Sequence, residues 1–185
     1  MNDIESILDF IKASEGLKLT ERSESYKSDG TKESVAEHSW RLALLASCLI
    51  PYYTNLDAAK VLTICLVHDL PEMITGDISA SQVELHALKA DAEKAAAEEV
   101  FSKLPSKSGI IEKLCFDYMN ADSPEAKFVK ALDKAETIIQ HNQGNNPENF
   151  NYQFNLSYGK GLFSGDEYLE KLRDLIDSET RSKIK

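Results

Sequence analysis

Residues 61–70 read VLTICLVHDL, an apolar helical run that ends on the adjacent pair His68 and Asp69. Apolar residues cover nearly every side of this helix, so we expect it at the centre of the domain. Burying an imidazole and a carboxylate side by side without partners is costly. A divalent metal ion offsets that cost, because it binds neutral imidazole nitrogen and carboxylate oxygen together. The pair therefore predicts a metal site, and with it a metal-dependent enzyme.

Two further helices supply candidate ligands. Residues 34–37 read SVAE, which predicts a capping box at a helix start, and His38 follows on the apolar face of that helix. Ser123 followed by a proline predicts the start of another helix, and Asp133 lies beside its apolar stripe. Three helices packed around one core could bring two imidazoles and two carboxylates together.

The rest of the chain also has helical patterns, and no period-2 strand pattern appears. We therefore expect one all-α domain over residues 1–185, a compact helical bundle. Asn55 should cap the helix that contains the quoted run, and Pro71 should bend the chain after it. The other expected features are an amphipathic helix around residues 4–11, a polar loop at 19–33, a helix from a cap at Ser81 to about Leu104, a helix at about 108–119, an irregular loop at about 142–164, and a C-terminal helix at about 165–178 capped at Ser164.

The composition limits the kinds of partner. The chain has 185 residues and a formal net charge of -10, which disfavours nucleic acid polymers because these are held chiefly by Lys and Arg. A small phosphorylated substrate remains compatible with a few local cations. The N-terminal sequence lacks the features of a signal peptide, and the longest apolar stretch is too short to span a bilayer. Three scattered cysteines fit a reducing compartment. We expect a cytoplasmic protein that has neither a nucleic acid nor a membrane as a partner.

Each candidate ligand has an ordinary explanation when it is taken alone. His38 alone indicates a core histidine with its hydrogen bonds satisfied. Asp133 alone indicates a helix-edge carboxylate paired with Lys130 or Lys134. The adjacent His-Asp pair is harder to explain without a cation, and the complete set is more specific than its members. We expect one divalent transition metal ion, and its identity stays open because these ligands suit Mn, Fe, Co, Ni and Zn alike.

Three blocks of the sequence together resemble a known family. They read ESVAEHSWRLALLA (residues 33–46), LVHDLPEMITGDI (66–78) and VKALDKAE (129–136). In this order and spacing they resemble the HD-domain phosphohydrolase superfamily, and within it the compact group typified by the bacterial 5′-deoxynucleotidase. The resemblance implies an all-α fold, hydrolysis of monophosphates and usually a homodimer. The metal ligands that it implies are His38, His68, Asp69 and Asp133.

The resemblance also implies roles for residues near the centre. Glu72 matches the last position of the family's HDxxE pattern, which suits a water-positioning or general-base role; its alternative is a first-turn acid favoured by the helix dipole. Asp77 would contact the sugar or assist the leaving oxygen, or would be only a turn carboxylate. Arg22 occupies the position of a phosphate-binding arginine, or is a solvated surface residue.

The chain departs from the family after Arg22. Close relatives carry a tryptophan directly or shortly after this arginine, whereas this chain reads SESY and reaches an aromatic residue only at Tyr26. Base and sugar preference, and whether Tyr26 replaces the tryptophan, therefore stay open, as does the role of residues 145–164. His141 ends the Asp133 helix, where we expect a cation that complements the helix dipole.

Together these features predict a metal-dependent phosphohydrolase that acts on small phosphomonoesters, with (deoxy)nucleoside 5′-monophosphates as the first substrates to test. One alternative is a non-catalytic nucleotide-binding regulatory module that keeps the metal for stability, although the intact HDxxE block argues against it. A second alternative is an HD enzyme that cleaves phosphodiesters.

Overall fold

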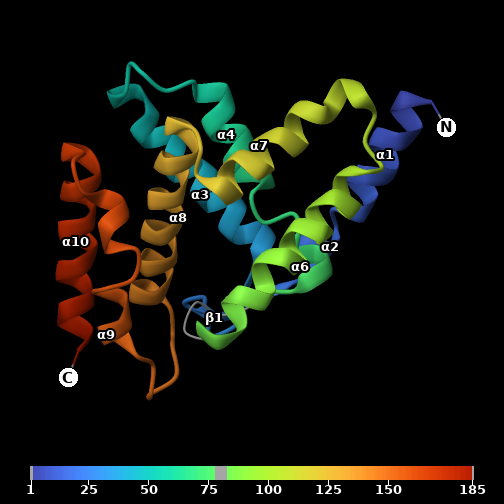
Figure 1. The fold of residues 1–185 in the computed structure, drawn as a ribbon. Coiled ribbons are helices and arrows are strands. Elements are labelled where there is room, and N and C mark those ends of the chain that lie inside the picture. The colour runs from blue at the N-terminus through green and yellow to red at the C-terminus, as the bar shows by residue number, and fades with distance from the viewer. Residues whose placement is uncertain (1, 78–82, 185) are drawn as a thin grey trace.

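The computed structural model describes residues 2–77 and 83–184, and the side chains of these residues except those of 83–90. Its helical architecture confirms the expected fold class (Figure 1). The helices are α1 (Asp3–Ala13), α2 (Gly16–Leu19), α3 (Val35–Leu49), α4 (Ala58–Val67), α5 (Glu72–Thr75), α6 (Val83–Phe101), α7 (Gly109–Asn120), α8 (Pro124–Gln143), α9 (Tyr152–Asn155) and α10 (Glu167–Lys183). Short 3-10 helices are η1 (Ile50–Tyr52), η2 (Ser106–Ser108) and η3 (Lys160–Phe163), and two strands are β1 (Glu21–Tyr26) and β2 (Lys32–Ser34).

The helix α4 lies in the middle of the molecule, as its all-round apolar pattern predicts. Its residues Val61, Ile64 and Cys65 are fully buried, and they pack with apolar side chains of α3, α7, α8 and α10 in one core cluster. Figure 1 shows α10 side by side with α8 on one flank of the bundle. A second cluster joins α1, α2, α6 and α7 around residues such as Phe10 and Phe101. The two clusters hold α3, α4 and α8 in fixed positions around the candidate ligands.

The expectation of a loop at 19–33 is wrong, because β1 and β2 form an antiparallel hairpin there. Its buried side chains are polar: Ser25 is 2% exposed and Glu33 is 3% exposed. A strand that buries polar residues lacks the apolar alternation by which strands are recognised. The hairpin carries Arg22 and Glu33 against α8.

The helix caps are partly as expected. Ser34 and Glu37 form the predicted capping box at the start of α3, and Ser123 caps α8. The prediction of Asn55 as a cap is wrong, because Asp57 accepts hydrogen bonds from the first N–H groups of α4. Asp166 likewise caps α10 in place of Ser164. Both aspartates stand directly before their helices. The expected cap at Ser81 lies outside the described residues.

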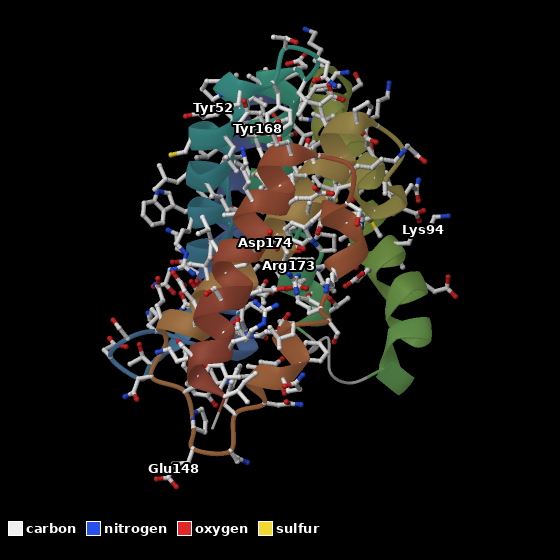
Figure 2. All side chains as sticks on the ribbon, turned by 90° about the vertical axis from the view of Figure 1, so that its left-hand side faces the viewer. Tyr52, Lys94, Glu148, Tyr168, Arg173 and Asp174 are labelled. Carbon is white, nitrogen blue, oxygen red and sulfur yellow. The ribbon has the colours of Figure 1, made fainter. Side chains whose placement is uncertain are left out.

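The connection between α8 and α10 is less irregular than expected. The helix α8 extends to Gln143, and α9 and η3 form short helical turns between residues 144 and 166. Figure 2 shows Glu148 at the tip of the loop before α9, and Arg173 and Asp174 on α10. The helix α10 runs to Lys183, beyond the expected end near residue 178. None of the helices in the described ranges has the length and apolar content needed to cross a bilayer.

Candidate metal centre

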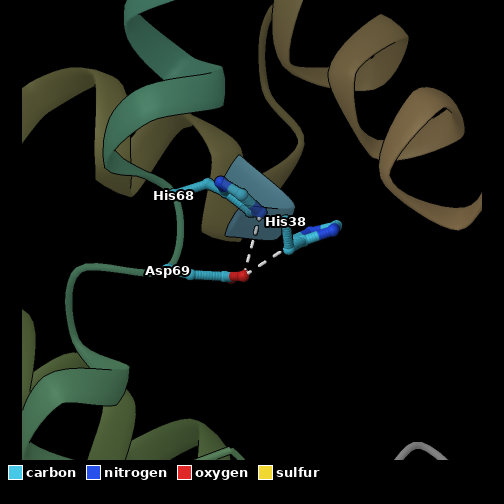
Figure 3. A group of neighbouring side chains, drawn as sticks. All are labelled: His38, His68 and Asp69. Atoms are coloured by element: carbon cyan, nitrogen blue, oxygen red, sulfur yellow. Dashed lines mark ion pairs between the residues drawn. The ribbon is translucent and has the colours of Figure 1, made fainter. Parts of the chain in front are cut away.

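Four side chains from separate parts of the chain meet inside the bundle. His38 projects from the first turn of α3, His68 and Asp69 follow α4, and Asp133 lies in the middle of α8. The His38 Nε2 atom is 3.2 Å from an Asp133 oxygen and 3.8 Å from an Asp69 oxygen. The His68 Nε2 atom is 3.1 Å from the same Asp69 oxygen. Figure 3 shows the Asp69 carboxylate facing both imidazoles. The structure thus brings together all four residues predicted as ligands.

The two imidazoles present buried Nε2 atoms that form no hydrogen bond with the described residues. The Nδ1 atom of His68 lies 3.0 Å from the Cys65 carbonyl oxygen and donates to it, while that of His38 contacts the Glu136 carboxylate. In neutral rings the Nε2 atoms therefore carry the lone pairs. Buried lone pairs that face carboxylate oxygens are unfavourable without a cation. Two imidazoles and two carboxylates fit one divalent transition metal ion, with positions left for water and substrate.

The two candidate carboxylate ligands are anionic. Burial would raise the pKa of Asp69, but the neighbouring His68 and His38 lower it to about 2. Burial also opposes ionisation of Asp133, yet Lys134 and His38 hold the pKa of its carboxyl well below the usual range. A divalent cation bound between the imidazoles and the carboxylates would likewise favour the anionic form of both carboxylates.

Asp133 is held in one orientation by two donors. The Tyr118 hydroxyl donates to its Oδ2 atom at 2.7 Å, and the Lys134 ammonium donates to the same atom at 2.7 Å. The Oδ1 atom is the one that faces His38. Asp133 thus forms the expected ion pair with Lys134 and also lies in the metal centre. The two explanations given for this residue from the sequence are compatible.

Arg22 lies in a buried network behind His38. Its Nη1 atom is 3.1 Å from a Glu33 oxygen and 3.5 Å from a Glu136 oxygen, and its Nη2 group donates to the Thr137 hydroxyl at 3.0 Å. Burial would lower the pKa of Arg22, but Glu136 and Glu33 raise it. Glu33, His38 and Glu136 stand close enough together to hold a cation, yet the Arg22 guanidinium already occupies the space against both carboxylates. Arg22 lines the cavity, as a phosphate ligand must, but its charge is already balanced.

Glu136 is a site residue that the sequence analysis missed. It is 1% exposed and contacts both His38 and Arg41. Burial opposes its ionisation, but His38 lowers the pKa of Glu136 to about 2. Burial and Arg22 would lower the pKa of His38, and the Glu136 and Asp133 carboxylates raise it to about 10. Glu136 therefore fixes the ring with its Nε2 atom toward the centre. Its position three residues after Asp133, on the same side of α8, is the signal that could have identified it.

Glu72 and Asp77 both lie on the wall of the cavity beside the centre. Glu72 begins α5 after the bend at Pro71, is 7% exposed, and lines the cavity. The Asp77 carboxylate accepts a hydrogen bond from the Ser23 backbone at 2.6 Å, and the Ser23 hydroxyl donates to the Asp77 carbonyl oxygen at 2.8 Å. Asp77 thus fastens the chain after α5 to the hairpin, and both carboxylates remain on the cavity wall.

A cavity of about 770 Å³ opens beside the centre. Its volume is within the range of small-molecule sites. Tyr26 is not among its lining residues; the Tyr26 ring instead lies 4.3 Å from the Lys32 ammonium. The lining includes the predicted residues Arg22, His68, Asp69, Glu72, Asp77 and Asp133, and the aromatic residues Phe116, Tyr118, Phe154 and Tyr158. Aromatic surface is therefore supplied by α7 and by the segment around α9, not by the chain after Arg22.

The prediction of a charged His141 is wrong. The side chain is buried, and its Nδ1 atom lies 2.9 Å from the Asn155 side-chain oxygen and donates to it. Burial lowers the pKa of His141 to about 4, so desolvation outweighs the helix dipole and the ring is neutral. This neutral ring connects α8 to α9 at the edge of the cavity.

The helical bundle and the His-Asp centre define a protein of the HD class. Residues 14–171 match the family described as HD domain, and the chain belongs to that family. It is similar to the 5′-deoxynucleotidase hdd1 of Schizosaccharomyces pombe, with 33% identity over 142 residues, 73% of this chain and 70% of that protein. It is also similar to the 5′-deoxynucleotidase HDDC2 of Xenopus laevis, with 34% identity over 138 residues, 73% of this chain and 67% of that protein.

A solved structure shares the fold over nearly the whole chain. A predicted metal-dependent phosphohydrolase from Magnetospirillum magnetotacticum superposes with a TM-score of 0.82 at 24% sequence identity, covering 98% of this chain and 97% of that one. At this identity the likeness establishes the fold alone.

Proposed function

We propose that this protein is a metal-dependent phosphohydrolase that cleaves deoxynucleoside 5′-monophosphates to deoxynucleosides and phosphate. The observation that carries the proposal is the convergence of two unpaired imidazole Nε2 atoms and two anionic carboxylates beside a cavity of about 770 Å³. The relatives named 5′-deoxynucleotidases support the choice of substrate class.

The ligand set proposed for the metal is His38, His68, Asp69 and Asp133. A bound divalent ion supplies a water of lowered pKa and polarises a phosphoryl oxygen. Imidazole nitrogens and anionic carboxylates suit such an ion, whose binding would displace the proton of His38, and the choice among Mn, Fe, Co, Ni and Zn is left to experiment.

The remaining roles are assigned from position. The Glu72 carboxylate would accept a proton from the attacking water as its oxygen bonds to phosphorus. The bond between phosphorus and the 5′ oxygen breaks, and that oxygen takes a proton from solvent, to which Glu72 afterwards returns the proton that it accepted. Asp77, on the same wall, would contact the deoxyribose or assist the leaving oxygen. Arg22 would contact the phosphate with the part of its guanidinium that faces the cavity.

The test is phosphate release from a panel of nucleotides by metal-stripped protein, with Mn, Co, Mg or Zn added back one at a time. We expect turnover of deoxynucleoside 5′-monophosphates with at least one metal. Folded protein that releases phosphate from no nucleotide with any of these metals would refute the proposal.

The same assay separates the two alternatives. A phosphodiesterase would cleave a cyclic or linear diester faster than the monoester. A regulatory module would bind a nucleotide in equilibrium dialysis without hydrolysing it. The buried Glu72, which is not among the proposed metal ligands, favours an enzyme over such a module.

We also propose that residues 1–185 form one domain and that two copies of the chain associate as a homodimer. The proposed location is the cytoplasm. The apolar side chains of Ile4, Leu8 and Ile11 on α1 are 73%, 52% and 59% exposed, so a face suited to association is present. Sedimentation equilibrium tests the assembly, and a monomer across the micromolar range would contradict it.

A further inference from the structure

We propose that Lys130 and Lys134 form a cation pair that binds the phosphate group of the substrate beside the metal centre. The inference rests on the proposed function, which it deepens by naming the residues that neutralise the substrate. Neither lysine belongs to the predicted ligand or catalytic set.

The two lysines reach the cavity from the same face of α8 as Asp133. They are four residues apart, so they lie one helical turn apart, and both line the cavity. The Lys134 ammonium lies 2.7 Å from the Asp133 Oδ2 atom, which places it directly beside the centre. Because α8 is a single continuous helix, the distance between the metal ligand and the two cations is fixed.

Aromatic rings hold the two ammonium groups at the cavity wall. The Lys130 Nζ atom is 4.3 Å from the centre of the Tyr118 ring, and the Lys134 Nζ atom is 5.1 Å from the centre of the Tyr158 ring. Both contacts are within the range of cation–π interactions. The rings restrict the long side chains without neutralising them, so the positive charge of Lys130 remains available to an anion, while Lys134 also donates to Asp133.

Charge balance around the centre calls for such cations. A phosphomonoester brings a charge of about -1.5 to -2 into a site that already holds several carboxylates. Arg22 lies against Glu33 and Glu136, and Arg41 lies against the same two carboxylates. These two arginines and two glutamates therefore balance one another.

The charges of the metal ligands would be balanced by the metal itself. The anionic Asp69 and Asp133 would offset the charge of a divalent ion, which leaves the substrate's own charge without a partner. Glu72 and Asp77 on the cavity wall add further negative charge, as do Asp91 and Glu93. Lys130 and Lys134 on α8 are cations placed to offset it, and Lys94 lies on the same cavity wall.

Lys130 and Lys134 are half-buried and one helical turn apart, so their charges repel each other. Burial, and then the charge of Lys134, lower the pKa of Lys130. An anion bound near Lys130 would relieve this repulsion, since a nearby opposite charge favours the charged form of the lysine.

The test compares Lys130→Met with Lys127→Met in the Mn²⁺-loaded enzyme. Lys127 is an exposed lysine on the same helix, so it controls for the loss of one positive charge. We expect Lys130→Met to raise both the KM for a deoxynucleoside monophosphate and the inhibition constant of inorganic phosphate by about tenfold, the effect of one charge-assisted hydrogen bond. The kcat should change by less than about threefold, Lys130→Arg should restore most of the binding, and Lys127→Met should match the wild type.

Two further measurements keep the inference separate from the proposed function. The Mn²⁺ affinity of Lys130→Met, measured by calorimetry, should stay within about threefold of the wild type, because Lys130 is not one of the proposed metal ligands. Unchanged KM and phosphate inhibition in an active Lys130→Met enzyme would overturn the inference and leave the hydrolase assignment intact.

If the wild type hydrolyses no nucleotide, calorimetry with inorganic phosphate and the Mn²⁺-loaded protein tests the cation pair directly. Binding that Lys130→Met weakens would support the pair, and equal binding or no binding would overturn it.

Discussion

Replacing His141 with asparagine should remove a pH-dependent part of the stability of this protein. The imidazole is 4% exposed and bridges α8 to α9 through the Asn155 side chain. The asparagine amide can donate the same hydrogen bond as the ring Nδ1–H, but it does not titrate. The substitution therefore separates the hydrogen bond from the cost of charging a buried ring.

The size of this effect follows from the linkage between proton binding and folding. The pKa of His141 is lowered from 6.5 to about 4 in the folded protein, chiefly by burial. The folded state thus binds fewer protons than the unfolded state between these two values. This contribution to stability is complete above the unfolded pKa, falls as the pH falls toward 4, and is lost below it. Between pH 7 and pH 5 the loss from this one group is about 2 kcal/mol.

Urea unfolding of the metal-free protein at pH 7 and pH 5 measures this contribution. The wild type should lose about 2 kcal/mol more than His141→Asn between the two conditions. Comparing the two proteins at each pH cancels the titration of the metal ligands, which they share. Equal losses in the two proteins, or an NMR titration that places the pKa of His141 near 6.5, would refute the reasoning.

Three further substitutions test the site and the segment that covers it. Glu72→Gln should lower kcat by about a hundredfold or more while leaving metal affinity unchanged; near-normal turnover would exclude Glu72 as the base. Tyr118→Phe removes the hydroxyl that orients Asp133 and should weaken metal binding by about tenfold or more in a chelator competition assay, whereas unchanged affinity would contradict that role. Arg173→Met leaves the buried Asp177 without its close ion partner and removes the hydrogen bonds to two carbonyl groups near α9. Urea unfolding should therefore show that the free energy of unfolding falls by about 3–5 kcal/mol. A fall below about 1 kcal/mol would show that the arginine is not needed there.

The proposed ligands could be predicted because each one interrupts an apolar pattern. His38 and the pair His68 and Asp69 stand in helices whose other inward positions are aliphatic, and Asp133 stands beside a similar stripe. A polar residue at a buried helical position must have a partner, and that requirement is visible without coordinates. The pattern could not reveal the partners themselves, because contacts such as that between Arg22 and Thr137 join residues 115 positions apart.

The hairpin and Glu136 were missed for the opposite reason. The buried positions of β1 and β2 are polar, so the strands carry no apolar alternation. Glu136 reads as an ordinary helical glutamate until the hairpin brings Arg22 against it. Its burial is stabilised by two arginines and a histidine from other elements, and a helical periodicity contains no information about them.

The helix α8 explains why binding of metal and of phosphate should depend on each other. Three residues of this one helix act at the site. Asp133 lies in the metal centre, Glu136 fixes the His38 ring, and the Thr137 hydroxyl accepts a hydrogen bond from Arg22. Lys130 and Lys134 extend the same face away from the centre. A straight helix with a rise of about 1.5 Å per residue leaves little freedom in these separations. A metal ion bound at Asp133 would therefore lie beside a phosphate bound at Lys134, and the attraction between these opposite charges would make each strengthen the binding of the other.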